Sequence, residues 1–197
     1  TLTIGQAGSP AEVRFNAGAG LTIGQDTGAH EGFAGKLLAT AVTFKANTAA
    51  PAAGFWDGIY VANTAAEGGI YLDACVVEGA GGAGANGAVA VNATSLVLRN
   101  GTAIRATGNV GLWLSASTAT VVTVTGGEIE GGSGPAVQAL GRSTLSLTSA
   151  TLRGGTYPVQ IQPNVILAAL GSNTATGYAP TQGGIAVEGG LMGSSGG

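Results

Sequence analysis

The sequence predicts an all-β chain that folds as a single-stranded parallel β-helix with three short strands in each coil. Three observations lead to this prediction. Short apolar-x-apolar segments recur roughly every 20–30 residues through the 197-residue chain. No long stretch shows the 3.6-residue period of an amphipathic helix. Glycine, with 37 residues, separates these segments and, with Asn, supplies the backbone conformations that tight corners need.

Residues 1–54 are expected to form the N-terminal coils. The chain opens with the strand-like "TLTIG", and "LTIG" returns at residues 21–24, one short coil later. The segment "QDTGAHEGFAG", residues 25–35, is longer than a plain corner. We therefore expect it to form a protruding loop.

Residues 55–190 are expected to form regular coils, because three columns of apolar residues repeat there in a fixed order. The first column forms the predicted inward core stack, with spacings of 30, 23, 25, 22 and 26: Ile59, Val89, Leu112, Val137, Val159 and Ile185. The second contains Leu72, Leu98, Val124, Leu147 and Leu167, and the third contains Phe44, Val77, Ile104, Ile129 and Leu152. Equivalent strands then pair in parallel about 4.8 Å apart, which gives about seven to eight coils.

A β-sandwich also offers many short strands, but it gives no reason for three columns in a fixed order. Residues 191–197, which are mostly glycine and serine, are expected to form a tail, and we expect residues 1–197 to be one solenoid domain.

The N-terminal half resembles a known family. The segments "VRFNAGAGLTIG", "GKLLATAVTF" and "FWDGIYV" look like the opening coils of bacterial right-handed parallel β-helix repeat proteins, and Trp56, Gly58 and Ile59 match the "W-x-G-I" element of that family. The resemblance extends over about residues 2–190. It implies a right-handed solenoid from an extracellular, surface or secreted protein. Because this fold carries lyases, adhesins and spacers, the resemblance specifies fold better than function.

Composition narrows the class of partners and the compartment. Charged residues make up 9% of the chain, with a net charge of −3 and no basic cluster, so nucleic acid is not an expected partner. No run of about 18 apolar residues is present, so no membrane-spanning helix is expected. The chain shows no signal peptide, and extracellular or cell-surface localisation presumes that one was removed or lies upstream. Cys75 is the only cysteine and is expected to be a buried thiol.

No catalytic residue, metal site or cofactor is expected. Polysaccharide lyases and hydrolases need several carboxylates on one face, as calcium ligands or as an acid/base pair. The chain has three aspartates, Asp26, Asp57 and Asp73, and none is adjacent to another. His30 is the only histidine and lies beside Glu31 in the predicted loop, where a solvated role is expected. An enzyme of the polysaccharide lyase or hydrolase type remains the second alternative function.

Aromatic side chains are the candidates for surface contacts with sugar or with another subunit. Alternation points Trp113 outward, and Tyr60 occupies the equivalent place two coils earlier, with Tyr71 as a third candidate and Trp56 as another sugar-stacking platform. Scattered surface aromatics are the plain alternative. The outward column beside the second apolar column is not a threonine ladder, so ice binding is not expected: Tyr71, Val97, Thr123, Ser146 and Ile166.

A column of charges follows the third apolar column. Its five members alternate strictly in sign: Lys45, Glu78, Arg105, Glu130 and Arg153. Parallel pairing would stack these side chains and make a ladder of ion pairs. Each exposed pair contributes only about 0–1 kcal/mol, but a one-coil slip would place like charges together, so the ladder is expected to fix the register.

These features predict a non-enzymatic structural segment of a bacterial surface solenoid, acting as a fibre or filament subunit or as a spacer. Both ends of the chain are strand-like and apolar, so the expected partners are copies of itself or adjacent repeats, stacked end to end. A carbohydrate-binding or adhesin module is the first alternative, with carbohydrate as its partner.

Overall fold

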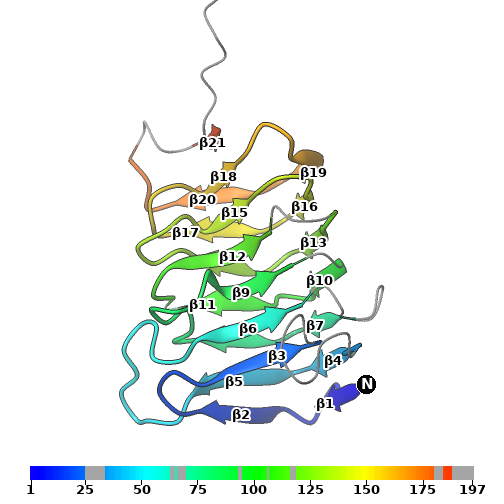
Figure 1. Cartoon of the computed structure of the whole chain (residues 1–197), viewed down its shortest axis with the longest axis vertical. Helices are drawn as coiled ribbons and strands as arrows, with labels where there is room; N and C mark the ends of the chain where they lie inside the picture. The colour runs from blue at the N-terminus through cyan, green and yellow to red at the C-terminus, as the bar shows by residue number, and fades with distance from the viewer. Residues whose placement is uncertain are drawn as a thin grey trace, which may run out of the picture.

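In the part of the chain that the structure describes, twenty-one short parallel strands wind into a right-handed β-helix, which confirms the predicted fold class (Figure 1). The computed structural model describes residues 1–24, 34–62, 65, 70–92, 95–105, 107–115, 119–179 and 184–187. Within these residues there is no α-helix, as the missing 3.6-residue period predicts. Most of the predicted 25–35 loop and all of the 191–197 tail lie outside the described residues.

Each coil contributes one strand to each of three sheets, which are named here for their first strands. The β1 sheet contains β1 (Leu2–Ile4), β4 (Leu37–Thr40), β7 (Tyr71–Asp73), β10 (Ser95–Arg99), β13 (Val121–Thr125), β16 (Thr144–Thr148) and β19 (Ile166–Gly171). The β2 sheet contains β2 (Ala11–Phe15), β5 (Val42–Ala46), β8 (Val76–Glu78), β11 (Ala103–Arg105), β14 (Glu128–Glu130), β17 (Thr151–Arg153) and β20 (Thr174–Thr176). The β3 sheet contains β3 (Gly20–Ile23), β6 (Gly58–Val61), β9 (Gly87–Val91), β12 (Val110–Leu114), β15 (Val137–Ala139), β18 (Val159–Ile161) and β21 (Ile185–Val187).

The first apolar column runs through the β3 sheet in register. Leu112 pairs with Val89 on one side and with Val137 on the other, and the same ladder continues to Ile59 and, through Val159, to Ile185. The side chains of the first five members are buried. Ile185 is the exception, because no described coil lies beyond β21 to cover it.

The other two columns define the β1 and β2 sheets, with one correction. Leu72, Leu98, Val124 and Leu147 pair in sequence, but the next member is Leu170 and not Leu167. A bulge between Leu145 and Ser146 admits one extra residue, Ala168, so Leu167 pairs with Leu145. The same shift makes Ala169 the outward partner of Ser146, where the sequence pattern predicted Ile166. The third column pairs from Phe44 to Leu152 as expected.

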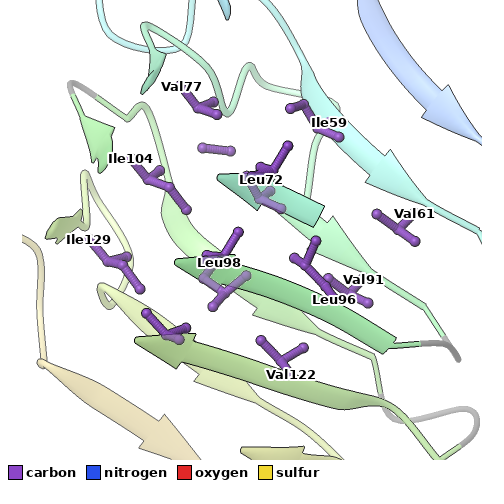
Figure 2. Close-up of a cluster of buried hydrophobic side chains, with 14 of the residues drawn as sticks. Ile59, Val61, Leu72, Val77, Val91, Leu96, Leu98, Ile104, Val122 and Ile129 are labelled. Carbon is purple, nitrogen blue, oxygen red and sulfur yellow. The ribbon is translucent and has the colours of Figure 1, made fainter. Parts of the chain in front are cut away.

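Inward side chains from the three sheets fill the interior. Figure 2 shows Leu72, Leu98, Val77 and Ile104 facing one another across the coil. All four are buried. Full burial of one such side chain stabilises the fold by roughly 1.5–3 kcal/mol. The alternation of buried and outward residues therefore accounts for the core of the inner coils.

A buried aromatic pair closes the N-terminal part of the core. The rings of Phe15 and Trp56 lie stacked, with centroids 4.1 Å apart and an interplanar angle of 2°. Trp56 is fully buried, and its indole Nε1–H donates a hydrogen bond of 2.8 Å to the carbonyl oxygen of Glu78. The prediction that Trp56 is a sugar-stacking platform is therefore wrong. The prediction was based only on residue type, which Trp56 shares with Trp113, whereas Trp56 lies in a corner where its side chain points inward.

The corners between the β1 and β2 sheets use a left-handed backbone conformation. Glycine and Asn supply it in some coils, as expected, but Ala41, Ala74, Ser149 and Ser172 also adopt φ values of 52° to 56°. This region disfavours residues that carry a Cβ. The corner N–H groups continue the parallel ladder: that of Ala41 donates to the carbonyl of Asp73 at 2.9 Å. The ladder to the next coil therefore holds the strained corner in place.

Candidate functional site

The predicted charge ladder lies on the outward face of the β2 sheet, but its ion pairs run diagonally. Glu78 is directly opposite Arg105, and Glu130 is directly opposite Arg153. The close contacts of this strip instead meet at Glu128, which accepts from Arg105 Nε at 2.8 Å and pairs with Arg153. Arg153 also reaches Glu130 at 3.7 Å.

The strip continues to the N-terminal coil through Glu12. Lys45 is opposite Arg14, so the strict alternation of charge ends there. Glu12 bridges the two cations, at 2.6 Å from Lys45 Nζ and 2.7 Å from Arg14. Hydrogen bonds from Lys45 and then Arg14 lower the pKa of Glu12 below its usual value. Lys45 thus pairs with Glu12, and within the described chain no ion pair reaches Glu78.

Sequence reasoning missed Glu12 and Glu128 because it followed a single column. Each lies two residues before a column position, and period-two alternation puts both on the same outward face. Diagonal neighbours are farther apart than directly opposite residues, but long arginine and lysine side chains still reach them. The strip is therefore self-neutralised, with both strong carboxylate acceptors already occupied, and it has the character of a structural network.

The predicted surface aromatics separate onto two sheets. Tyr60 and Trp113 lie on the outward face of the β3 sheet with Ala90 paired between them. Tyr71 lies on the β1 sheet, where the guanidinium carbon of Arg99 is 5.3 Å from the centre of its ring. The three residues therefore do not make one aromatic strip.

Two surface grooves adjoin these aromatics. The one beside Tyr71, about 400 Å³ in volume, is bordered by Asp73 and Arg99, which form an ion pair of 2.8 Å. Asn100 donates a second hydrogen bond to Asp73 at 2.7 Å. Because Asp73 already pairs with Arg99 and Asn100, these polar groups hold the corner of the solenoid together, and we assign this groove a structural role.

The other groove, about 360 Å³ in volume, lies over the first strands of the β3 sheet. The lining residues that carry polar or aromatic groups are Thr22, Asp57, Tyr60 and Asn86. Tyr60 Oη accepts a hydrogen bond of 3.1 Å from Asn92 Nδ2, which orients its ring. This groove combines an aromatic wall with hydrogen-bonding groups, and it is the candidate binding site of the chain.

Other reactive groups do not form a site in the described part of the chain. No group of three or more His, Cys, Asp or Glu side chains that could hold a metal ion occurs there. Cys75 is a buried free thiol, and burial raises its pKa above the usual value. His30 and Glu31 lie outside the described residues. The described residues also contain no helix long and apolar enough to span a membrane.

The first and last coils of the described structure expose apolar side chains that inner coils bury. Among the described residues, six large hydrophobic side chains are strongly exposed. Four of them lie on β1, β19 and β21 and pair with buried residues of the adjacent coil: Leu2 at 46%, Leu170 at 45%, Ile185 at 41% and Val187 at 53%. The other two, Val121 at 46% on the inner strand β13 and Ile166 at 60% on β19, belong to one outward column, since both pair with Thr144. Exposed apolar surface is therefore concentrated at the two ends of the solenoid.

Comparison of the chain with protein-family models, with curated proteins and with solved structures finds no match.

Proposed function

We propose that this chain is a non-enzymatic structural solenoid segment of a bacterial cell-surface or extracellular protein, and that its end coils stack on the end coils of further copies. It would act as a fibre or filament subunit, or as a spacer where the next coils belong to the same polypeptide. The observation that carries the proposal is the concentration of exposed apolar side chains on β1, β19 and β21.

The last coil presents the same side-chain column that forms the core. Ile185 and Val187 continue the ladder of Val159 and Ile161, both of which are buried one coil below. Placing another coil on β21 would remove this apolar surface from water, which stabilises the contact by about 25 cal/mol for each Å² buried. It would also pair the free edge of β21, whose outer N–H and C=O groups have no strand beside them in the described structure.

The first coil offers a matching surface. Leu2 is exposed, and Val13 and Leu21 are only partly buried, whereas Phe44 and Ile59, which follow Val13 and Leu21 in the ladders, are buried. A copy stacked head to tail would place β3 beside β21, so that leucine and isoleucine columns continue. Such a contact does not close on itself, and repetition produces a fibre.

Charge also favours the head-to-tail arrangement. The outward residues of β20 are Thr174 and Thr176, which are neutral, whereas β2 carries Glu12 and Arg14 in the equivalent places. A head-to-tail contact therefore places hydroxyl groups beside the charged pair and brings no like charges together. The ion pairs of Glu12 with Lys45 and Arg14 would remain intact.

Sedimentation velocity and negative-stain microscopy at rising concentrations of the 197-residue chain test this proposal. We expect the wild-type chain to form linear assemblies that grow with concentration, because each added copy repeats the same contact. Val187→Asp places a charge in the contact and is expected to keep the chain monomeric. Val121→Asp is the matched control, because Val121 is equally apolar and similarly exposed but lies on an inner coil.

Two outcomes contradict the proposal. One is a wild-type chain that stays monomeric at every concentration. The other is equal loss of assembly in the Val121→Asp and Val187→Asp variants, since this would place the contact on the side of the solenoid. Circular dichroism of both variants establishes that each retains the β fold.

A further inference from the structure

The groove over the β3 sheet owes its shape to a run of glycines. The three strands beneath it begin with Gly20, Gly58 and Gly87. A Cβ at Gly58 would lie 2.3 Å from the carbonyl oxygen of Ala88, and a Cβ at Gly87 would lie 3.0 Å from Trp113 Cβ. A side chain at Gly58 would clash with that carbonyl group, and one at Gly87 would be tight against Trp113. The starts of these three strands therefore place no side chain over the groove, whereas the other described strands begin with residues that carry one.

One wall of the hollow is aromatic. Tyr60 is partly exposed, and the hydrogen bond that its hydroxyl group accepts from Asn92 holds the ring in one orientation. Ala90, the next residue of the outward column, is small and almost fully covered, and Trp113 follows it, partly exposed. Two coils separate Tyr60 from Trp113, which corresponds to about 9–10 Å along the solenoid axis.

The rim supplies hydrogen-bonding groups of mixed type. Asp57 offers a carboxylate, Thr22 a hydroxyl group and Asn86 an amide. The Asp57 carboxylate lies close to the glycine-rich turn before β9. A Cβ added at Gly82 in that turn would lie only 2.9 Å from Asp57 Oδ1, so the absence of a side chain there leaves room for the carboxylate. None of the lining residues is a cation, so a phosphate or carboxylate ligand would meet one uncompensated negative charge.

We propose that this groove binds a neutral saccharide, with one sugar ring stacked on Tyr60 and its hydroxyl groups bonded to Asp57 and Asn86. A pyranose has an apolar C–H face and a rim of hydroxyl groups, which matches an aromatic wall beside polar groups. The volume of about 360 Å³ lies within the roughly 300–1,000 Å³ typical of small-molecule sites. A chain of sugars running along the axis would reach Trp113, so an oligosaccharide binds more tightly than a monosaccharide.

The site and the end-to-end contact use different surfaces of β3, the outward face for the site and the free edge for the contact. The groove lies over the outward face of β3, β6 and β9, and a stacked copy would add its β21 at the edge of β3 away from β6 (Figure 1). A fibre would therefore repeat the groove once in every copy, on one side, and would bind a polysaccharide at several points.

Titration calorimetry with cellohexaose, maltohexaose, glucose and hexagalacturonate tests the proposal. We expect at least one neutral hexasaccharide to bind, glucose to bind more weakly, and the anionic hexamer to bind least. Tyr60→Ala should lower the affinity for the bound hexasaccharide by about tenfold or more, while Tyr60→Phe keeps most of it because the ring remains. Tyr71→Ala is the matched control, since Tyr71 is a partly exposed tyrosine on another sheet.

Tryptophan fluorescence gives a second, independent readout. The chain has two tryptophans, and Trp56 is fully buried, so acrylamide quenches chiefly Trp113. Bound hexasaccharide should protect Trp113 from acrylamide. The proposal is overturned if neither neutral hexasaccharide binds, if hexagalacturonate binds most tightly, or if Tyr71→Ala and Tyr60→Ala weaken binding equally. Unchanged melting temperatures of the variants would show that lost binding is not lost folding.

Discussion

Leu112 and Ile185 occupy equivalent positions of one ladder but differ in burial, and replacing each by alanine isolates the contribution of burial. Leu112 is fully buried, with a coil on each side, whereas Ile185 is 41% exposed on the last described strand of the β3 sheet. Truncation removes apolar atoms from both. Only at Leu112 does it leave a cavity that neighbouring coils must close over.

The expected magnitudes differ by a factor of several. Leu112→Ala removes three carbons, worth about 2.4 kcal/mol at roughly 0.8 kcal/mol each, and the cavity brings the loss of unfolding free energy to about 3–4 kcal/mol. Ile185→Ala should cost about 1 kcal/mol, since a large part of its side chain is already in water. Leu112→Asp would go further than alanine, because it buries an unpaired carboxylate.

Urea denaturation followed by circular dichroism, at protein concentrations too low for association, measures both values. Equal losses for Leu112→Ala and Ile185→Ala would refute the assignment of Ile185 to an open end. A loss below about 1 kcal/mol at Leu112 would refute its place in the core. If copies stack, the loss caused by Ile185→Ala should grow with concentration, because the contact buries that side chain.

Four further outcomes are expected. Glu128→Gln removes the bridge between Arg105 and Arg153 and should lower the unfolding free energy by about 1 kcal/mol, whereas Glu78→Gln should change it less; high salt should narrow the difference. Cys75 should resist Ellman's reagent at about pH 8 until the chain is unfolded, because burial raises its pKa and covers the sulfur. Glu12 has a lowered pKa in the fold, so its carboxylate stabilises the fold above the unfolded pKa of 4.5, and this stabilisation disappears as pH falls through the folded pKa. Thermal melts at several pH values should therefore show Glu12→Gln to be less stable than the wild type above that range and equally stable below it. Ser149→Gly should raise the urea midpoint, with a gain of up to about 1 kcal/mol from relief of its left-handed backbone.

Alternation along the strands predicts most of the fold, because a residue that points inward must be apolar. The ladder from Ile59 to Ile185 follows from this rule alone. The rule fails at β19, because the inserted Ala168 lies in a run of apolar residues, so both possible registers place apolar residues inward. Nothing in a run such as "ILAALG" distinguishes the two alignments, and the pairing with Leu145 and Leu147 decides between them.

The candidate site was less accessible to sequence reasoning. Alternation identified Tyr60 and Trp113 as outward residues of one column, and the register places them there with Ala90 between. Asp57 gave no signal of its own, because its relation to Tyr60 depends on how the corner before β6 turns. Spacing along the chain does not specify the shape of a corner, so the groove required coordinates.

The strained corners have a consequence for how the chain assembles during synthesis. Residues such as Ala74 hold a left-handed conformation with the help of a hydrogen bond to the adjacent coil, here from Ala74 N–H to the carbonyl of Arg99 at 3.1 Å. An isolated coil lacks that bond and has little reason to bend this way. A chain that emerges N-terminus first would therefore add one coil at a time, each new coil fixing the corner of the one made before it. Folding then proceeds from the N-terminus to the C-terminus, and the corner of the most recently made coil still lacks its stabilising hydrogen bond.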